Sequence, residues 1–197
     1  MSKDAASKAQ DAVAKTSQVS DADVGATQGC PYAAARQEVA ARMAELEAQG
    51  HGPQRHEGQI TDQQLEDRAV SGIDPVSGTT TDAFTGQPHK YGRHATKINS
   101  PEAFVQAEQE LASSAAFANE AAAAEAAGDD WAVAEMPLEE IYGPDYKDQV
   151  SGKTRLGSKN NPTGAENTDF TDGTMKGVYK KSDTGDWNLH SMYPEPK

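Results

Sequence analysis

His56 and Arg68 form a pair whose residue types suit chemistry on a phosphate. The ordinary pKa of histidine lies near neutrality, so His56 can exchange protons at little cost. The guanidinium of Arg68 offers a fork of donors that fits a phosphate or a developing oxyanion. Each residue also has a purely structural interpretation. A histidine can simply support the start of a helix, and an arginine near a helix C-terminus is favoured by the helix dipole.

A second group of polar side chains is expected on the last strand. Strict alternation over 187–193 gathers four side chains on one face, namely Trp187, Leu189, Ser191 and Tyr193. It turns His190 to the other face. Pro194 has no backbone donor and is expected to stop the strand at once. The hydroxyls of Ser191 and Tyr193 can donate to a phosphoryl oxygen; alternatively, the tyrosine ring packs on the core and the serine is tolerated beside it.

The elements that must position these residues follow from capping signals and periodicity. Thr61 and Gln64 form a capping box that starts a short helix, and Ser100-Pro101 starts a long one that is expected to reach about Ala127. The other expected elements are a helix over 32–48, an ordered loop over 71–92, an extended piece over 93–98, a strand over 131–136, a turn-like helix over 137–145, a strand around 153–156, and a hairpin of 174–181 with 187–193.

This order predicts an α+β fold, with N-terminal helices followed by a small, mainly antiparallel β-sheet. We expect two parts. Residues 1–50 form a helical or partly disordered leader or linker, in which 1–29 offer little apolar surface to offset the ordering entropy. Residues 51–197 form the functional domain.

The composition limits the classes of function. The mean hydropathy of −0.78 predicts a small core, and the net charge of −13 argues against nucleic acid as a partner. However, a net −11 lies within residues 101–150, and the flanking segments are near neutral. Cys30 is the sole cysteine, so no internal disulfide and no thiolate metal cluster is expected. Neither a signal peptide nor a membrane-spanning segment is evident, so we expect a soluble protein, either cytosolic or exported without a cleaved signal.

An ordered set of short motifs resembles a known family. The set comprises Arg55-His56-Glu57-Gly58-Gln59-Ile60-Thr61-Asp62, then Leu65 and Arg68, then Ala95-Thr96 and Ser100-Pro101-Glu102-Ala103, and finally Val178-Tyr179, Gly185-Asp186-Trp187 and Ser191-Met192-Tyr193-Pro194. It resembles the RNase A-like toxin domains at the C-termini of bacterial contact-dependent inhibition proteins and related polymorphic toxins. The resemblance extends over residues 51–197.

The resemblance implies an RNase-like toxin fold and cleavage of RNA without a metal or other cofactor, with a cognate immunity protein occluding the cleft. It places the catalytic roles on His56, Arg68, Ser191 and Tyr193. It also implies export, action in the cytoplasm of a target cell, and docking of residues 1–50 on a secretion carrier or chaperone. Three departures stand out: Ser191 replaces a threonine, the His56-to-Arg68 spacing is one residue longer, and residues 71–92 resemble an insertion.

The remaining site residues are assigned by chemistry and position. His94 is the first candidate for the second proton carrier, because it lies beside Arg93 and two residues before Thr96. His190 is a poorer candidate because alternation turns it away, and His51 and His89 are expected at the surface. Substrate contacts are expected from four residues: Arg93, Thr96, Lys153 and Arg155. Lys153 and Arg155 can equally be solvated loop charges.

Two other classes remain open. One is a toxin that acts on NAD, an ADP-ribosyltransferase or NAD glycohydrolase, with Glu139 and Glu140 as candidate site residues. The other is a non-enzymatic binding module, favoured by the acidic, Ala-rich helices. A metal-dependent nuclease is disfavoured because no His-x-x-x-His pair occurs on an expected helix.

Overall fold

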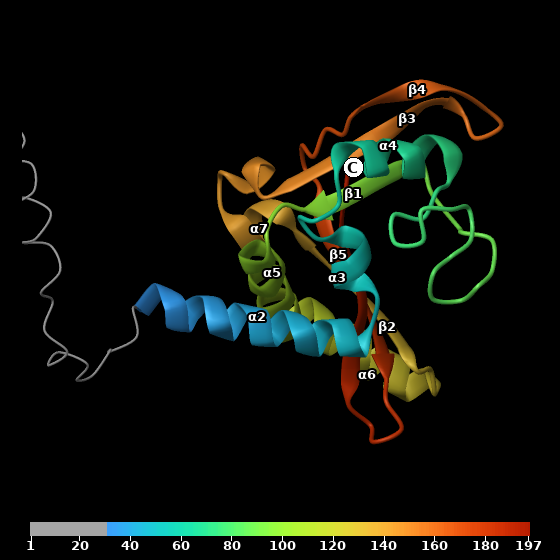
Figure 1. The fold of residues 1–197 in the computed structure, drawn as a ribbon. Coiled ribbons are helices and arrows are strands. Elements are labelled where there is room, and N and C mark those ends of the chain that lie inside the picture. The colour runs from blue at the N-terminus through green and yellow to red at the C-terminus, as the bar shows by residue number, and fades with distance from the viewer. Residues whose placement is uncertain (1–30) are drawn as a thin grey trace, which may run out of the picture. The chain divides into compact units, whose positions relative to one another are not determined.

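The computed structural model describes residues 31–197, so the expectations for 1–29 lie outside the described residues. Figure 1 shows helices arranged around strands, a mixed α+β fold as predicted. By their contacts the residues divide into two units, Met1–Arg36 and Gln37–Lys197, and every described strand belongs to the second unit.

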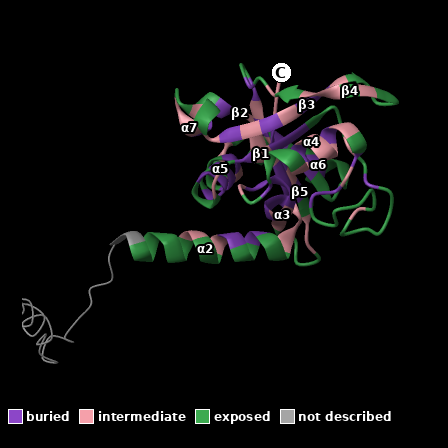
Figure 2. Cartoon of the chain, turned by 45° about the horizontal axis from the view of Figure 1, so that its top comes forward, coloured by how far each residue is buried: buried purple, intermediate pink, exposed green. Residues whose placement is uncertain are grey.

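Helix α2 (Pro31–Gln49) corresponds to the helix predicted over 32–48. Its buried positions, Met43 and Leu46, lie in its second half (Figure 2). Leu46 is fully buried, and both residues belong to the main hydrophobic cluster. The compact unit therefore begins upstream of the boundary expected at residue 50.

The strands form two small antiparallel sheets instead of the single sheet expected. One has the order β1-β3-β4, with β1 at His94–Ile98, β3 at Val150–Ser158 and β4 at Asn161–Asn167. The other has the order β2-β5-β6, with β2 at Trp131–Pro137, β5 at Thr174–Lys181 and β6 at Trp187–Glu195. Strand β4 was not predicted, because its seven residues show no apolar alternation.

Strand β6 contains a β-bulge that corrects the predicted alternation. Val178 pairs with Ser191 and Tyr179 with Leu189, so His190 is the extra residue. Leu189 and Met192 therefore both face the core, where they are buried. The bulge moves Ser191 and Tyr193 to the face opposite Leu189, whereas strict alternation had put the three together.

Strand β6 also continues through Pro194, where the sequence predicted its end. Pro194 pairs with Met175, and Glu195 with Thr174. Because β6 is the edge strand of its sheet, a residue without an N–H group can be tolerated there.

Two short helices precede β1. Helix α3 (Gly52–His56) begins with proline in its first turn, and α4 (Asp62–Ser71) begins with the predicted capping box at Thr61. Gly72 ends α4 in the left-handed conformation, with φ of 71°, which favours glycine. The loop after Gly72 leads to β1 and contains one isolated bridge, Thr81 to Pro88.

The long helix predicted from Pro101 to Ala127 is two helices, α5 (Pro101–Ser113) and α6 (Ala115–Ala127). Ser114 has an extended backbone and separates them. Its hydroxyl donates to the carbonyl of Leu111 at 2.7 Å and accepts from the N–H of Phe117 at 3.0 Å. These local bonds replace helical ones and stabilise the break. The turn-like segment contains α7 (Leu138–Tyr142) and is followed by the 3₁₀ helix η1 (Tyr146–Asp148).

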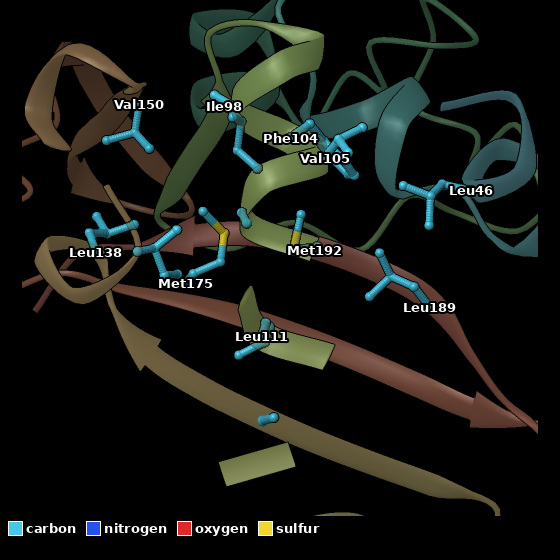
Figure 3. Packing of buried hydrophobic residues seen from close by; sticks show 14 of the residues in the cluster. Leu46, Ile98, Phe104, Val105, Leu111, Leu138, Val150, Met175, Leu189 and Met192 are labelled. Carbon is cyan, nitrogen blue, oxygen red and sulfur yellow. The ribbon is translucent and has the colours of Figure 1, made fainter. Parts of the chain in front are cut away.

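The main core lies between helix α5 and the strands (Figure 3). Phe104 and Leu111 of α5 are fully buried, as are Met175 and Met192 of the facing strands. Leu46 joins this cluster from α2. A smaller cluster of Ile60, Leu65, Ala69 and Ala95 holds α4 against β1. No helix among residues 31–197 is long and apolar enough to cross a membrane.

The packing of α2 predicts a stability effect. Leu46→Ala should lower the free energy of unfolding by about 2–5 kcal/mol, since it removes a fully buried side chain and leaves a cavity. Urea unfolding followed by circular dichroism measures this loss. The adjacent exposed Glu47→Ala is the matched control and should change stability by less than about 0.5 kcal/mol. Equal stability of the two variants would mean that α2 is not part of the folded core.

Candidate functional site

A cavity of about 400 Å³ lies where the two sheets meet. It gathers most of the residues singled out in the sequence, from four separate elements. From the predicted set it is lined by His56, Arg68, Arg93, His94, Thr96, Ser191 and Tyr193. It is also lined by His51, Arg55, Lys90, Gly92, Pro194, Glu195 and Pro196.

His56 is held in one orientation at the end of α3. Its Nδ1 lies 2.8 Å from the carbonyl oxygen of Thr96. A carbonyl can only accept, so Nδ1 carries the proton and the neutral ring keeps its lone pair on Nε2. Burial, the nearby positive charge of Arg68, and the charges of His51 and Arg55 lower the pKa of His56 well below 6.5, although the Thr96 bond opposes them. His56 is therefore neutral, with an unprotonated Nε2.

Thr96 connects the parts that meet at the cavity. Its carbonyl accepts from His56, and its hydroxyl donates to the carbonyl of Pro194 at 2.6 Å. It is 4 % exposed. Thr96 in β1 therefore links α3 to β6. Its contact with substrate remains a prediction.

Arg68 brings a half-buried cation to the cavity from the last turn of α4. Its Nη1 is buried and has no hydrogen-bond partner among the described residues. Burial, together with the neighbouring charge of Arg55, lowers its pKa to about 10, so the guanidinium stays protonated at neutral pH. A buried, unpartnered donor of this kind is an incomplete binding site for an anion.

Tyr193 and Ser191 line the cavity from β6. The ring of Tyr193 stacks on that of His56, with centroids 5.1 Å apart and planes inclined by 29°. Burial raises the pKa of Tyr193, so its hydroxyl remains a proton donor at neutral pH. Ser191 is buried and lines the same space.

His94 and Arg93 line the cavity from the start of β1. The Nδ1 of His94 is 2.9 Å from the hydroxyl of Thr154. Burial and the adjacent charge of Arg93 lower the pKa of His94 from 6.5, against a smaller opposing effect of Glu195. Arg93 donates through Nε to the carbonyl of Arg155 at 3.2 Å.

Lys153 and Arg155 do not line the cavity. Lys153 donates to the Oδ1 of Asn167 at 2.8 Å. Arg155 is buried, and its Nη1 donates to the carbonyls of Ala69 and Gly92 at 2.8 and 3.0 Å. Arg155 therefore braces α4 against the segment before β1, and neither side chain is aimed at the space that holds His56.

The sequence interpretation missed four charged or titratable residues of the cavity, namely His51, Arg55, Lys90 and Glu195. His51 had been expected at the surface because it lies between two glycines. Those glycines instead permit close packing, since a Cβ at Gly50 would collide with the carbonyl of His190 and one at Gly52 would lie 3.1 Å from the backbone nitrogen of Met192. The N–H of His51 donates to the carbonyl of His190 at 3.0 Å. The pair of glycines on either side of His51 was the sequence signal that could have revealed this close packing.

His89, also expected at the surface, is buried. Its Nδ1 lies 3.0 Å from the carbonyl of Gly72.

Arg55 holds the loop between α4 and β1 against the cavity. Its Nη2 lies 3.0 Å from Asp74 and 2.6 Å from Asp82. Burial opposes ionisation of both carboxyls. Backbone N–H groups and Arg55 outweigh this effect, so the pKa of each lies below 3.8. The apparent insertion over 71–92 is therefore anchored by buried charge.

Comparisons with protein-family models, curated proteins and solved structures found no match to the chain. Residues 31–197 contain no group of three or more His, Cys, Asp or Glu side chains placed to hold a metal ion.

The buried histidines predict how stability depends on pH. The pKa of His51 is lowered to about 4, by burial first and then by Arg55 and His190, and that of His56 lies well below 6.5. Between pH 6.5 and about 4 the unfolded chain therefore binds more protons than the folded one, so stability decreases as the pH falls. Urea unfolding at a series of pH values should show this slope.

The His51→Gln and His56→Gln variants should each reduce the slope of unfolding free energy against pH. The reduction should correspond to at most one bound proton per variant. Lys159→Gln is the control: it removes an exposed charge that does not line the cavity and should leave the slope unchanged. Asp74 and Asp82 act in a separate window, because their stabilising effect is lost only as the pH falls below about 3.8. A flat profile between pH 6.5 and 4 in the wild type would contradict the burial of the two histidines.

Proposed function

We propose that this chain is an endoribonuclease that cleaves RNA by transphosphoesterification, leaving a 2′,3′-cyclic phosphate and a 5′-hydroxyl. One observation carries the proposal: His56, fixed with a free Nε2, and the unpartnered guanidinium of Arg68 line one cavity with the hydroxyls of Ser191 and Tyr193. These are a proton acceptor, a cation for phosphate, and donors for its oxygens.

The first half of the reaction needs a base and a stabilised phosphorane. Nε2 of His56 takes the proton of the ribose 2′-hydroxyl while the 2′-oxygen forms a bond to phosphorus. Negative charge grows on the equatorial phosphoryl oxygens. Arg68 and the hydroxyls of Ser191 and Tyr193 donate to these oxygens, in a site from which water is partly excluded.

The second half breaks the bond between phosphorus and the 5′-oxygen, which must receive a proton. We assign this proton to His94, which lines the same cavity. Its pKa is lowered in the free protein, and a bound phosphate would raise it by supplying the opposing negative charge. Arg93 and Lys90, on the same wall, provide further positive charge for flanking phosphates.

On the basis of the sequence resemblance, the proposal also includes an RNase-like toxin fold and a biological role. Two small antiparallel sheets with a cleft between them are compatible with an RNase-like toxin fold. We accordingly propose a toxin of interbacterial competition that is exported, acts in the cytoplasm of a target cell, and is blocked by an immunity protein over the cleft. Docking of residues 1–50 on a carrier or chaperone belongs to the same proposal.

Ribonuclease activity is tested directly with the purified full chain. RNA should be degraded in the presence of EDTA, and end-group analysis should find 2′,3′-cyclic phosphate. His56→Ala should reduce the rate by about 10²–10⁴-fold, because it removes the general base. Arg68→Ala should reduce it by about 10²–10³-fold, because it removes a donor to the transition state. Full activity of His56→Ala would falsify the assignment.

Glu139→Gln and Glu140→Gln are the control variants and also test the NAD-directed alternative. Both side chains are exposed on α7, and neither lines the cavity. RNA cleavage should therefore be unchanged in both. Loss of toxicity with either variant, with RNA cleavage intact, would favour the alternative.

Expression in bacteria should arrest growth, and the His56→Ala variant should relieve the arrest because it is catalytically inactive. Growth curves after induction measure this, with immunoblots to match the amounts of the two proteins. Harmless expression of the wild type at the same level would instead favour the non-enzymatic binding module.

A further inference from the structure

Four aromatic rings form a continuous row, and one of its two inner rings lines the cavity. His51 lines the cavity, and its ring centroid is 5.3 Å from that of Phe84 and 4.6 Å from that of His190. The ring of His190 lies 5.1 Å from that of Trp131. We call this set the aromatic row. It joins the loop after α4, the turn before α3, strand β6 and strand β2.

Both ends of the aromatic row are open to solvent. Phe84 is 46 % exposed and Trp131 is 41 % exposed, and neither belongs to a core cluster. Ring faces in water are unfavourable, and a planar partner that covers them would recover that free energy. The row therefore has the chemistry of a stacking platform.

Cations accompany the rings. The guanidinium carbon of Arg55 lies 4.8 Å from the centroid of Phe84, and Nζ of Lys180 lies 5.4 Å from that of Trp131. Arg55 is compensated by Asp74 and Asp82, so Lys180 and the cavity residues Arg68, Lys90 and Arg93 provide the positive charge available to a ligand. Exposed rings with Lys180 and a cationic cavity beside them suit the bases and phosphates of an unpaired strand.

We propose that the aromatic row binds an unpaired polynucleotide strand on its way into the cavity, with bases stacked on Trp131 and Phe84. The proposal rests on the proposed ribonuclease function and narrows its substrate class to single-stranded RNA. A duplex fits poorly, because its bases are already stacked on one another and offer no free ring face.

Trp131 supplies the decisive test, because two rings separate it from the cavity and its loss leaves the reacting groups in place. The probe is a fluorescein-labelled, non-self-complementary 12-nucleotide DNA strand, which has no 2′-hydroxyl and so cannot undergo the proposed cleavage. Fluorescence anisotropy with the full chain measures its Kd. Trp131→Ala should weaken binding about 5- to 150-fold, the range for loss of one stacked base.

Two matched variants separate stacking from mere apolar surface. Val133 is 42 % exposed and lies on the same strand as Trp131, and Val76 is 42 % exposed in the same loop as Phe84. Val133→Ala and Val76→Ala should keep Kd within about twofold, whereas Phe84→Ala should weaken binding and Trp131→Phe should retain most of it. Thermal melting of each variant verifies that it is folded.

The outcomes separate the two proposals. An unchanged Kd for folded Trp131→Ala, or equal affinity for the strand and its duplex, would overturn the aromatic row as a strand-binding site and assign the exposed rings to a protein partner. A weakened Kd for Trp131→Ala in a protein that cleaves no RNA would support strand binding and overturn the ribonuclease function alone. With cleavage present, Trp131→Ala should raise KM for a 12-nucleotide RNA while kcat is kept.

Discussion

The hydrogen bonds of Thr96 are the interaction on which the arrangement of the site depends. The carbonyl accepts from Nδ1 of His56, and the hydroxyl donates to the carbonyl of Pro194. One buried residue therefore fixes the tautomer of the histidine and the spacing between the two sheets. Because the bonded groups come from three elements far apart in the chain, the cavity exists only when all of them are packed, and chemistry and folding are coupled at this residue.

Buried positive charge is the second constraint. Arg55 and Arg68 both lie beside His56, and each disfavours a further proton there. Two carboxylates from the loop after α4 compensate Arg55, which leaves Arg68 available for a ligand. A site of this type favours an anion, since an anion offsets the desolvation of Arg68 and the mutual repulsion of the cations. The strongly acidic chain is thus compatible with a locally cationic cleft.

Local signals predicted much of the fold and part of the site. The capping box at Thr61 set the start of α4, and the apolar alternation gave β2 and β5. The features that the sequence did not predict depend on non-local packing or on the conformation of a single residue. The helix break at Ser114 lies within a run of good helix formers. The charge of Arg55 is neutralised by two aspartates, and no sequence periodicity connects them to it. Seven of the nine predicted site residues line the cavity, and both residue chemistry and the family resemblance had indicated them.

The bulge at His190 sets the phase of the closing strand. Before the bulge, Leu189 faces the core. After it, the alternation is shifted by one residue, so that Ser191 and Tyr193 face the cavity. Without the bulge, regular alternation from Leu189 through His190 would send Met192 toward the cleft and both hydroxyls into the core. Because the bulge only absorbs His190 as an extra residue, a related chain that lacks a residue at this position should place the same side chains on the same faces with a regular strand.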